Sequence, residues 1–214
     1  MSASSQNTSK IAYFCASLSY IKVISEEIQR EVGACLDVLN KGGTIVYPTD
    51  TIWGIGCDAT NQNAVSRIYS IKKRMGSKNM IVLIDDASKL SLYVKKIPLI
   101  TSDLLSNMNT PLTIIFPGGR NLAPNLLGAD GSIAIRIVDH EFCRELIREF
   151  GRPVVSTSAN LSGQPNPHSF QDINPVITSM VDYTVGLFHE STSSGKPSRI
   201  IRLYENGEFN VIRP

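Results

Sequence analysis

The segment GGTIVYPTDTIWGIGCDA, from Gly42 to Ala59, constrains the fold of this chain more than any other. Its TIVY run is rich in β-branched and aromatic residues, which predicts a buried strand. Pro48 ends the hydrogen-bond ladder of that strand, because proline has no N–H to donate. If the next three residues stay extended, Thr49 and Thr51 point to one face and Asp50 points to the other. The segment therefore predicts a core strand whose end carries polar groups.

Two glycines follow in GIGCDA, which fits the G-x-G-x-x-A pattern of dinucleotide-binding proteins. That motif needs its first glycine at a strand-to-helix turn and an acidic residue about 20 positions later. Here a polar stretch separates the strand from the glycines, and Arg74 stands at the later position. We therefore interpret Gly54 and Gly56 as turn residues. The chain also has no G-x-S-x-G nucleophile elbow, so a hydrolase triad has no support in the sequence.

Helical and strand patterns interleave along the remaining sequence. The helical patterns are ISEEIQREVGACLDVLNKGG, NQNAVSRIYSIKK, HEFCRELIREFG, two short segments within 86–108 and one segment near Phe170 to Met180. The strand patterns are MIVLID, PLTIIFPGG, GSIAIRIVD, RPVVSTSAN, YTVGLF and RIIRLYENGEFNVIR. The last of these predicts a hairpin that turns on Asn206-Gly207. The hairpin and the closely spaced strands favour a mixed sheet over a purely parallel one, and we predict the α/β class.

Composition is that of an ordinary globular protein. The 214 residues are 42% hydrophobic and 19% charged, which suits one domain with a sizeable core. We expect a loose N-terminal tail over residues 1–20 and a single domain over 21–214. The net charge of +2 neither demands nor excludes a nucleic-acid partner. No apolar run approaches a membrane span, and the cysteines stand apart without histidines at ligand spacing, which predicts a cytoplasmic protein with no metal site of its own.

Polar groups recur at the ends of the predicted strands. In VVSTSAN, the period of two places Ser156, Ser158 and Asn160 on one face. In GSIAIRIVD, the isoleucines face the core, which leaves Ser132 and Arg136 on the opposite side. Ligands of open α/β sheets bind at such strand ends. The alternative is ordinary polar alternation on a solvated face, which explains any one of these strands better than it explains them together.

A run of cations follows the second helical pattern. Lys72 and Arg74 stand two residues apart, so on a continuing helix they would diverge by about 200°. They converge on one ligand if the helix ends there, and Gly76 makes that end plausible. An ammonium and a guanidinium together suit phosphate or carboxylate oxygens. The competing interpretation is a solvated charge run.

With these segments, the sequence resembles the YrdC-type threonylcarbamoyl-AMP synthases. The resemblance rests on YPTDTIWGIG, on the K-x-R of residues 72–74, and on PLTIIF, IAIRI, STSANLSG and KPSRII, in order along nearly the whole chain. It implies a single domain with a twisted mixed sheet, flanking helices and a concave basic cavity. The implied reaction converts L-threonine, bicarbonate and ATP, with Mg²⁺ carried by the ATP phosphates, into threonylcarbamoyl-AMP and pyrophosphate. The product then serves other tRNA-modification proteins, which would be partners together with tRNA.

The resemblance also implies roles for particular residues. The catalytic residues would be Lys72 and Arg74. The residues that bind threonine and bicarbonate would be Thr51, Arg136 and Ser156, with Arg136 on the threonine carboxylate. The residues that bind the nucleotide would be Arg74, Asn79, Ser132, Ser158, Asn160, Ser198 and Arg213. Thr49 and Thr113 would support them from behind.

The sequence departs from the family pattern in several places, and other functions stay open. Met75 replaces the proline that commonly follows K-x-R, and Asn166 stands where a serine is common near ATP. The main alternative is a non-catalytic module of the same fold that binds double-stranded RNA or tRNA. Others are a sister paralogue without synthase activity and a carbamoyl-transfer domain of hydrogenase maturation. Sparse stacking aromatics argue against RNA binding, and the intact K-x-R and S-x-N pairs argue against an inactive paralogue.

Overall fold

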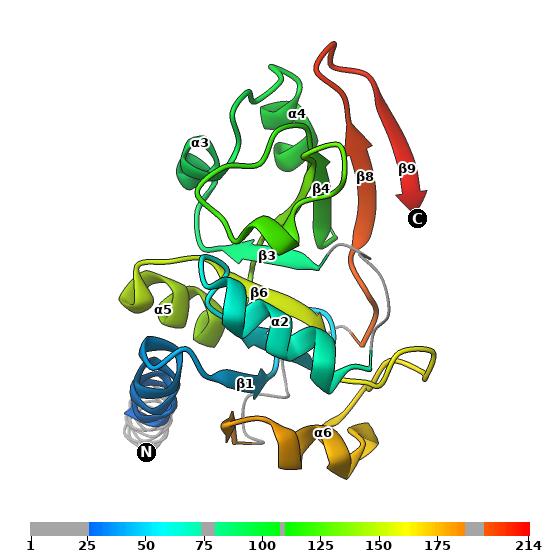
Figure 1. The fold of residues 1–214 in the computed structure, drawn as a ribbon. Helices are drawn as coiled ribbons and strands as arrows, with labels where there is room; N and C mark the ends of the chain where they lie inside the picture. The colour runs from blue at the N-terminus through cyan, green and yellow to red at the C-terminus, as the bar shows by residue number, and fades with distance from the viewer. Residues whose placement is uncertain (1–25, 74–79, 108–109, 187–194) are drawn as a thin grey trace, which may run out of the picture.

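Strands from every part of the chain pair into one mixed sheet (Figure 1). The computed structural model describes residues 26–73, 80–107, 110–186 and 195–214, so the tail expected over 1–20 lies outside the described residues. The strands are β1 (Thr44–Tyr47), β2 (Gly54–Cys57), β3 (Ile81–Ile84), β4 (Leu112–Phe116), β5 (Ile133–Ile137), β6 (Val154–Ser158), β7 (Tyr183–Thr184), β8 (Arg199–Leu203) and β9 (Phe209–Arg213). Their order is β7-β1-β2-β6-β3-β5-β4-β8-β9. Parallel pairs (β1–β7, β3–β5, β4–β8) stand among antiparallel ones, which confirms the α/β class and the mixed sheet.

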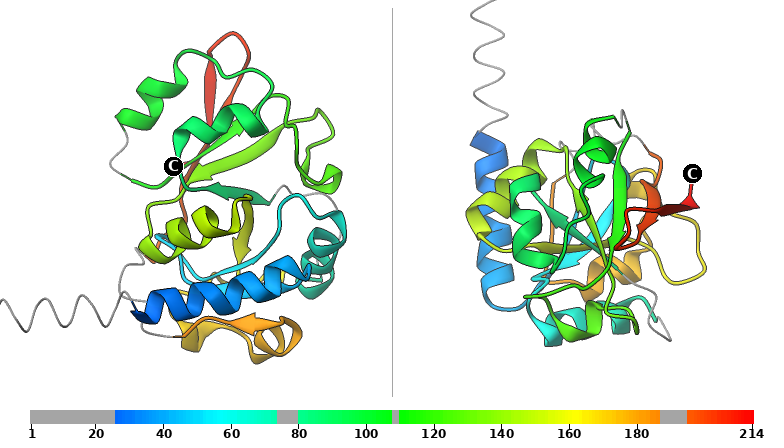
Figure 2. Two further views of the ribbon diagram at one scale, coloured as in Figure 1. Left: turned by 90° about the vertical axis from the view of Figure 1, so that its left-hand side faces the viewer. Right: turned by 90° about the horizontal axis from the view of Figure 1, so that it is seen from above.

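Helices cover both faces of the sheet (Figure 2). They are the N-terminal helix, described over residues 26–40, α2 (Gln62–Ile71), α3 (Leu90–Tyr93), α4 (Thr101–Ser106), α5 (Glu141–Phe150) and α6 (Pro175–Met180), with short 3₁₀ turns η1 (Ala87–Lys89), η2 (Pro124–Leu126) and η3 (Phe170–Asp172). Apolar side chains of the N-terminal helix and α5 form one core cluster, and those of α2 belong to the other. Alternate residues of one strand enter different clusters: Leu83 joins the first, and Val82 and Ile84 join the second.

The two glycines of GIGCDA do not form a turn, so that prediction is wrong. Gly54 and Gly56 lie in β2, which returns from β1 as an antiparallel neighbour and also pairs with β6. A Cβ on Gly56 would stand 2.5 Å from the carbonyl oxygen of Val155 and 2.6 Å from the ring of Tyr47. Gly56 is therefore required by the close approach of neighbouring chain segments and not by backbone bending.

The helix expected from Phe170 to Met180 is also divided. It consists of η3 and α6, because Pro175 begins a new helix at its first position and Asn174 caps that helix with its side chain. The C-terminal hairpin is confirmed. β8 pairs with β9, and Gly207 takes a φ of 88° in the turn between them.

Candidate functional site

Strand pairing gathers polar residues from distant parts of the sequence onto one face of the sheet. Arg136 of β5 is paired in register with Thr113 of β4, Thr113 with Ile200 of β8, and Ile200 with Arg213 of β9. Paired residues of neighbouring strands point to the same side. The row therefore aligns two arginines that the sequence separates widely, at the wall of one cavity.

The cavity has a volume of about 230 Å³. Its lining includes six of the predicted site residues: Thr51, Arg136, Ser156, Ser158, Ser198 and Arg213. Trp53, Gly54 and Pro197 also line the cavity, although the sequence did not predict them as site residues. Asn166, which stands where the family commonly has a serine near ATP, lines it as well. Arg74 and Asn79 lie outside the described residues, so their predicted roles stay predictions.

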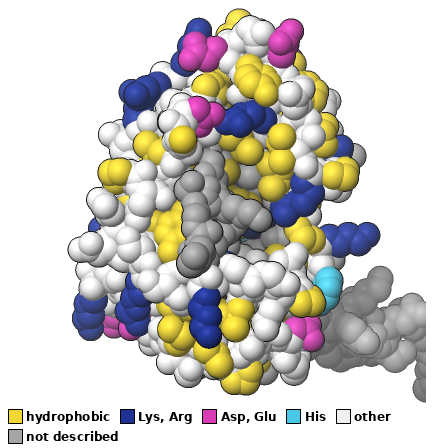
Figure 3. Space-filling model, turned by 45° about the vertical axis from the view of Figure 1, so that its right-hand side comes forward, with side chains coloured by type: hydrophobic (Ala, Val, Ile, Leu, Met, Phe, Trp, Pro, Cys, Tyr) yellow, Lys and Arg dark blue, Asp and Glu magenta, His cyan; other side chains and the backbone are white. Residues whose placement is uncertain are grey.

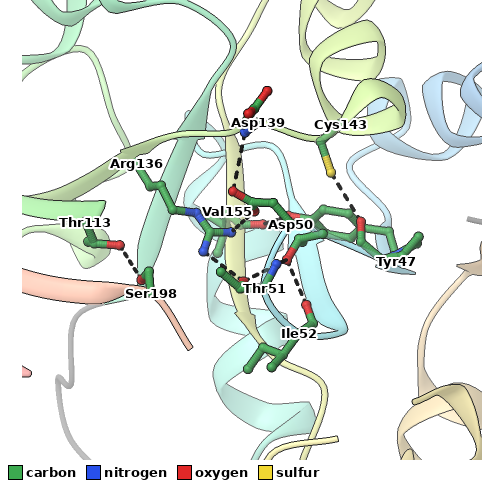
Figure 4. A network of polar contacts seen from close by, with 12 residues as sticks. Tyr47, Asp50, Thr51, Ile52, Thr113, Arg136, Asp139, Cys143, Val155 and Ser198 are labelled. Atoms are coloured by element: carbon green, nitrogen blue, oxygen red, sulfur yellow. Dashed lines mark hydrogen bonds and ion pairs between the residues drawn. The ribbon is translucent and has the colours of Figure 1, made fainter. Parts of the chain in front are cut away.

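Arg136 is the best-buried charge in the cavity wall, with 3% of the residue exposed. Its Nη1 donates to Thr51 Oγ1 at 2.8 Å, and its Nη2 lies 3.2 Å from Asp50 Oδ1 (Figure 4). Its Nε has no hydrogen-bond partner within the described part of the chain. Buried guanidinium groups normally fill all their donor positions. The arrangement therefore suits a ligand carboxylate in the cavity.

Asp50 and Thr51 both meet Arg136, so the prediction that they point to opposite faces is wrong. Residues 50–52 bend after β1 and do not continue the extended strand. The Thr49 hydroxyl stabilises this bend. It donates to the carbonyl oxygen of Ile52 at 2.8 Å and accepts from the backbone N–H of Thr51 at 3.1 Å. Thr49 therefore stabilises the backbone beside the site. Asp50 belongs to the site, although the sequence pattern had predicted that it points to the opposite face.

Lys72 and the S-x-N motif meet at the end of β6. α2 ends at Ile71, and Lys73 takes a left-handed φ of 49°, which confirms that the helix stops at the K-x-R motif. Lys72 Nζ then reaches the carbonyl oxygen and the Oδ1 of Asn160, at 2.7 and 3.1 Å. Ser158 Oγ donates to the same Asn160 Oδ1 at 2.5 Å. The two motifs are therefore in direct contact.

Polar residues of β4, β8 and β9 form a second group of contacts, of which Ser198 and Arg213 line the cavity. Thr113 Oγ1 and Ser198 Oγ lie 2.7 Å apart, and Arg213 Nε donates to the carbonyl oxygen of Ser198 at 2.8 Å. Burial lowers the pKa of the Arg213 guanidinium, and the positive charge of Arg136 lowers it further. Arg136 is paired with Asp50, whereas Arg213 has no carboxylate partner among the described contacts. The positive charge of Arg213 therefore makes the cavity attractive to anions.

Three predicted residues, Lys72, Ser132 and Asn160, do not belong to the described lining of the cavity. Asn160 stands behind Ser158, and Ser132 accepts a hydrogen bond from Arg202 Nη2 at 3.1 Å. Arg202 also pairs with Asp130. Arg202 was missed because its strand reads as an ordinary hairpin arm. Ile200 lines the cavity, and the period of two places Arg202 on the same side of β8, which was the available signal.

On the one face that Figure 3 draws, the described Lys and Arg side chains do not gather into a single patch. They are spread among apolar and neutral ones. The two charged residues described in the cavity lining are both arginines. The concave basic cavity thus stays a prediction. No group of three or more metal-ligating side chains is found in residues 26–73, 80–107, 110–186 and 195–214, and no helix there is long and apolar enough to cross a membrane.

Known proteins resemble this chain over most of its length. A family model, Sua5_yciO_yrdC, described as "Telomere recombination", matches residues 37–214. The threonylcarbamoyl-AMP synthase of Pseudoalteromonas translucida (strain TAC 125) is 37% identical over 160 residues, 73% of this chain and 86% of that protein. The crystal structure of E. coli YciO is 27% identical, with a TM-score of 0.75 over 86% of this chain and 89% of that one. P. abyssi Sua5 complexed with L-threonine is 25% identical, with a TM-score of 0.72 over 80% of this chain and 50% of that one, so this chain spans about half of that structure.

Proposed function

This chain belongs to the Sua5/YciO/YrdC family, and from that premise we propose that it is an enzyme, a threonylcarbamoyl-AMP synthase. L-Threonine and bicarbonate would condense to a carbamate with loss of water. A carbamate oxygen would then attack the α-phosphate of ATP, releasing pyrophosphate and leaving threonylcarbamoyl-AMP, which makes the enzyme a nucleotidyltransferase. Its product would pass to other tRNA-modification proteins, and tRNA would be their common substrate in the cytoplasm.

The observation that carries this proposal is the environment of Arg136. A buried guanidinium whose Nε has no partner among the described residues is suited to an amino-acid carboxylate in the cavity. Thr51 and Ser156 line the same cavity and offer hydroxyl groups to the amino acid. Together with the family relationship, this geometry supports a threonine site that Thr51, Arg136 and Ser156 would form.

The nucleotide would occupy the rest of the cavity. Ser158, Ser198 and Arg213 line it, and Ser132, Asn160, Arg74 and Asn79 complete the proposed set. Such a displacement needs no protein nucleophile, because alignment of the carbamate and neutralisation of phosphate charge supply most of the rate. Lys72 and Arg74 would be the essential cations. Mg²⁺ would enter on the ATP phosphates and offset their charge.

The test is threonine-dependent release of pyrophosphate from ATP in the presence of bicarbonate, with L-serine and no amino acid as comparisons. We expect release with threonine and its collapse in Arg74→Ala. Turnover of ATP without any amino acid would contradict the proposal. Absence of turnover together with tight, salt-sensitive RNA binding would favour the RNA-binding module instead.

Thr51→Val is expected to weaken threonine binding by about 1–3 kcal/mol, because valine leaves the Arg136 donor and the ligand without the hydroxyl between them. Titration calorimetry with L-threonine measures this loss. Thr60→Val is a matched control, because the Thr60 hydroxyl bonds to Asp58, away from the cavity lining. Unchanged threonine affinity in Thr51→Val would remove Thr51 from the site.

A further inference from the structure

The Lys72 ammonium is buried, with 3% of the residue exposed, and it faces the end of β6. Its Nζ donates to the carbonyl oxygen of Ser158, to the carbonyl oxygen of Asn160 and to Asn160 Oδ1. An ammonium group has three protons and no lone pair. Among the described contacts, three oxygens of the S-x-N segment thus equal the number of its protons. A phosphate oxygen would have to displace one of them.

The contact continues on the backbone. The carbonyl oxygen of Lys72 accepts from the N–H of Ser162 at 3.1 Å, so the chain after α2 is attached to the segment after β6 at both the side chain and the main chain. Asn160 Nδ2 also donates to the carbonyl oxygen of Gln164 at 2.5 Å. These bonds brace a segment that carries no regular secondary structure after β6 ends.

The brace bears directly on one cavity residue. Ser158 lines the cavity, whereas Lys72 and Asn160 do not belong to its described lining. Asn160 Oδ1 accepts from Lys72 Nζ and from Ser158 Oγ together. Lys72 thus orients the Asn160 amide, and that amide orients the Ser158 hydroxyl.

We infer that Lys72 is a positioning residue for the nucleotide half of the site, acting through Asn160 and Ser158, and not a phosphate ligand. This inference rests on the proposed function and refines the role of one of its two essential cations. Loss of Lys72 should therefore lower the affinity for every ligand that touches Ser158, whatever the number of phosphates on that ligand. The threonine half should be spared, because the bonds of Arg136 run to Asp50 and Thr51.

The test measures the dissociation constants of AMP, ATP and L-threonine by titration calorimetry for the unaltered chain, Lys72→Met and Lys73→Met. In Lys72→Met we expect AMP and ATP affinity to fall by the same factor, about tenfold or more, since several charge-assisted bonds are lost. Threonine affinity should change by less than about twofold. The exposed neighbour Lys73 supplies the matched control, and Lys73→Met should change none of the three.

A double-mutant cycle separates the brace from general damage. If Lys72 acts through Asn160, the effects of Lys72→Met and Asn160→Ala on AMP affinity should be far from additive. Lys72→Gln, which keeps a donor and removes the charge, replaces Lys72→Met if the latter does not fold, with the same pattern expected.

Three results would overturn the inference while leaving the proposed function intact. The first is a loss of affinity in Lys72→Met that is larger for ATP than for AMP. The second is a loss of threonine affinity as large as the loss of nucleotide affinity. The third is that the effects of Lys72→Met and Asn160→Ala on AMP affinity are additive. Failure of the unaltered chain to bind both threonine and nucleotide would instead overturn the proposed function, and the inference with it.

Discussion

Arg136→Leu is expected to destabilise the fold by about 3–5 kcal/mol, because it leaves the Asp50 carboxylate buried without its cation. Asp50 is 8% exposed, so water cannot replace the lost partner at low cost. The only other described bond to that carboxylate is a long one, 3.4 Å, from the backbone N–H of Asp139. Unfolding in urea, followed by circular dichroism, measures the change.

A second substitution tests the cause. Adding Asp50→Asn to Arg136→Leu removes the unpaired charge, so the double variant should recover a substantial part of the lost stability. Arg144→Leu is the surface control. Its ion pair with Asp139 is exposed on both sides and should contribute less than about 1 kcal/mol. If the double variant is less stable than Arg136→Leu, the buried charge is not the source of the effect.

Gly56→Ala is expected to destabilise the protein by about 1–3 kcal/mol or more, because the sheet has no room for a Cβ there. The added atom would stand within 2.6 Å of both the Val155 carbonyl oxygen and the Tyr47 ring, neither of which is the end of a flexible chain. Tyr47 is 1% exposed and its hydroxyl bonds to the same Val155 oxygen at 3.1 Å, so relief requires movement of β6. The thermal unfolding midpoint should fall by several degrees.

Gly33→Ala provides the opposite case on the same chain. Gly33 lies on the exposed side of the N-terminal helix, and a Cβ there meets nothing within 4 Å. Alanine should stabilise that helix by about 0.5–1 kcal/mol. If Gly56→Ala and Gly33→Ala changed the unfolding stability equally, the close contacts around Gly56 would not be the reason for a glycine at that position.

The sequence predicted local features of the site well. The period of two in SIAIRIV correctly placed Ile133 and Ile135 in the core and turned Arg136 away from them. The residues after α2 were expected to leave the helix, and the backbone at Lys73 does so. These features depend on neighbouring residues, which a sequence pattern records directly.

Errors arose where distant segments approach one another. Gly54 and Gly56 looked like turn residues because the sequence does not show that β6 lies against β2. Asp50 was turned away from Arg136 because the bend after β1 depends on a side-chain hydroxyl and not on a proline or glycine signal. The contact of Lys72 with the end of β6 likewise depends on the tertiary structure, and the predicted catalytic role of Lys72 stays a prediction.

By itself, the sequence determined the α/β class, most of the alternation of strands and helices, and the side of β5 on which Arg136 stands. Backbone geometry imposes those periods within a few residues. The tertiary structure decided which strands are neighbours, and hence that Arg136 and Arg213 share one cavity wall. It also decided which cations are held by carboxylates or carbonyl oxygens, because the cost of burying a charge depends on partners that arrive from elsewhere in the chain.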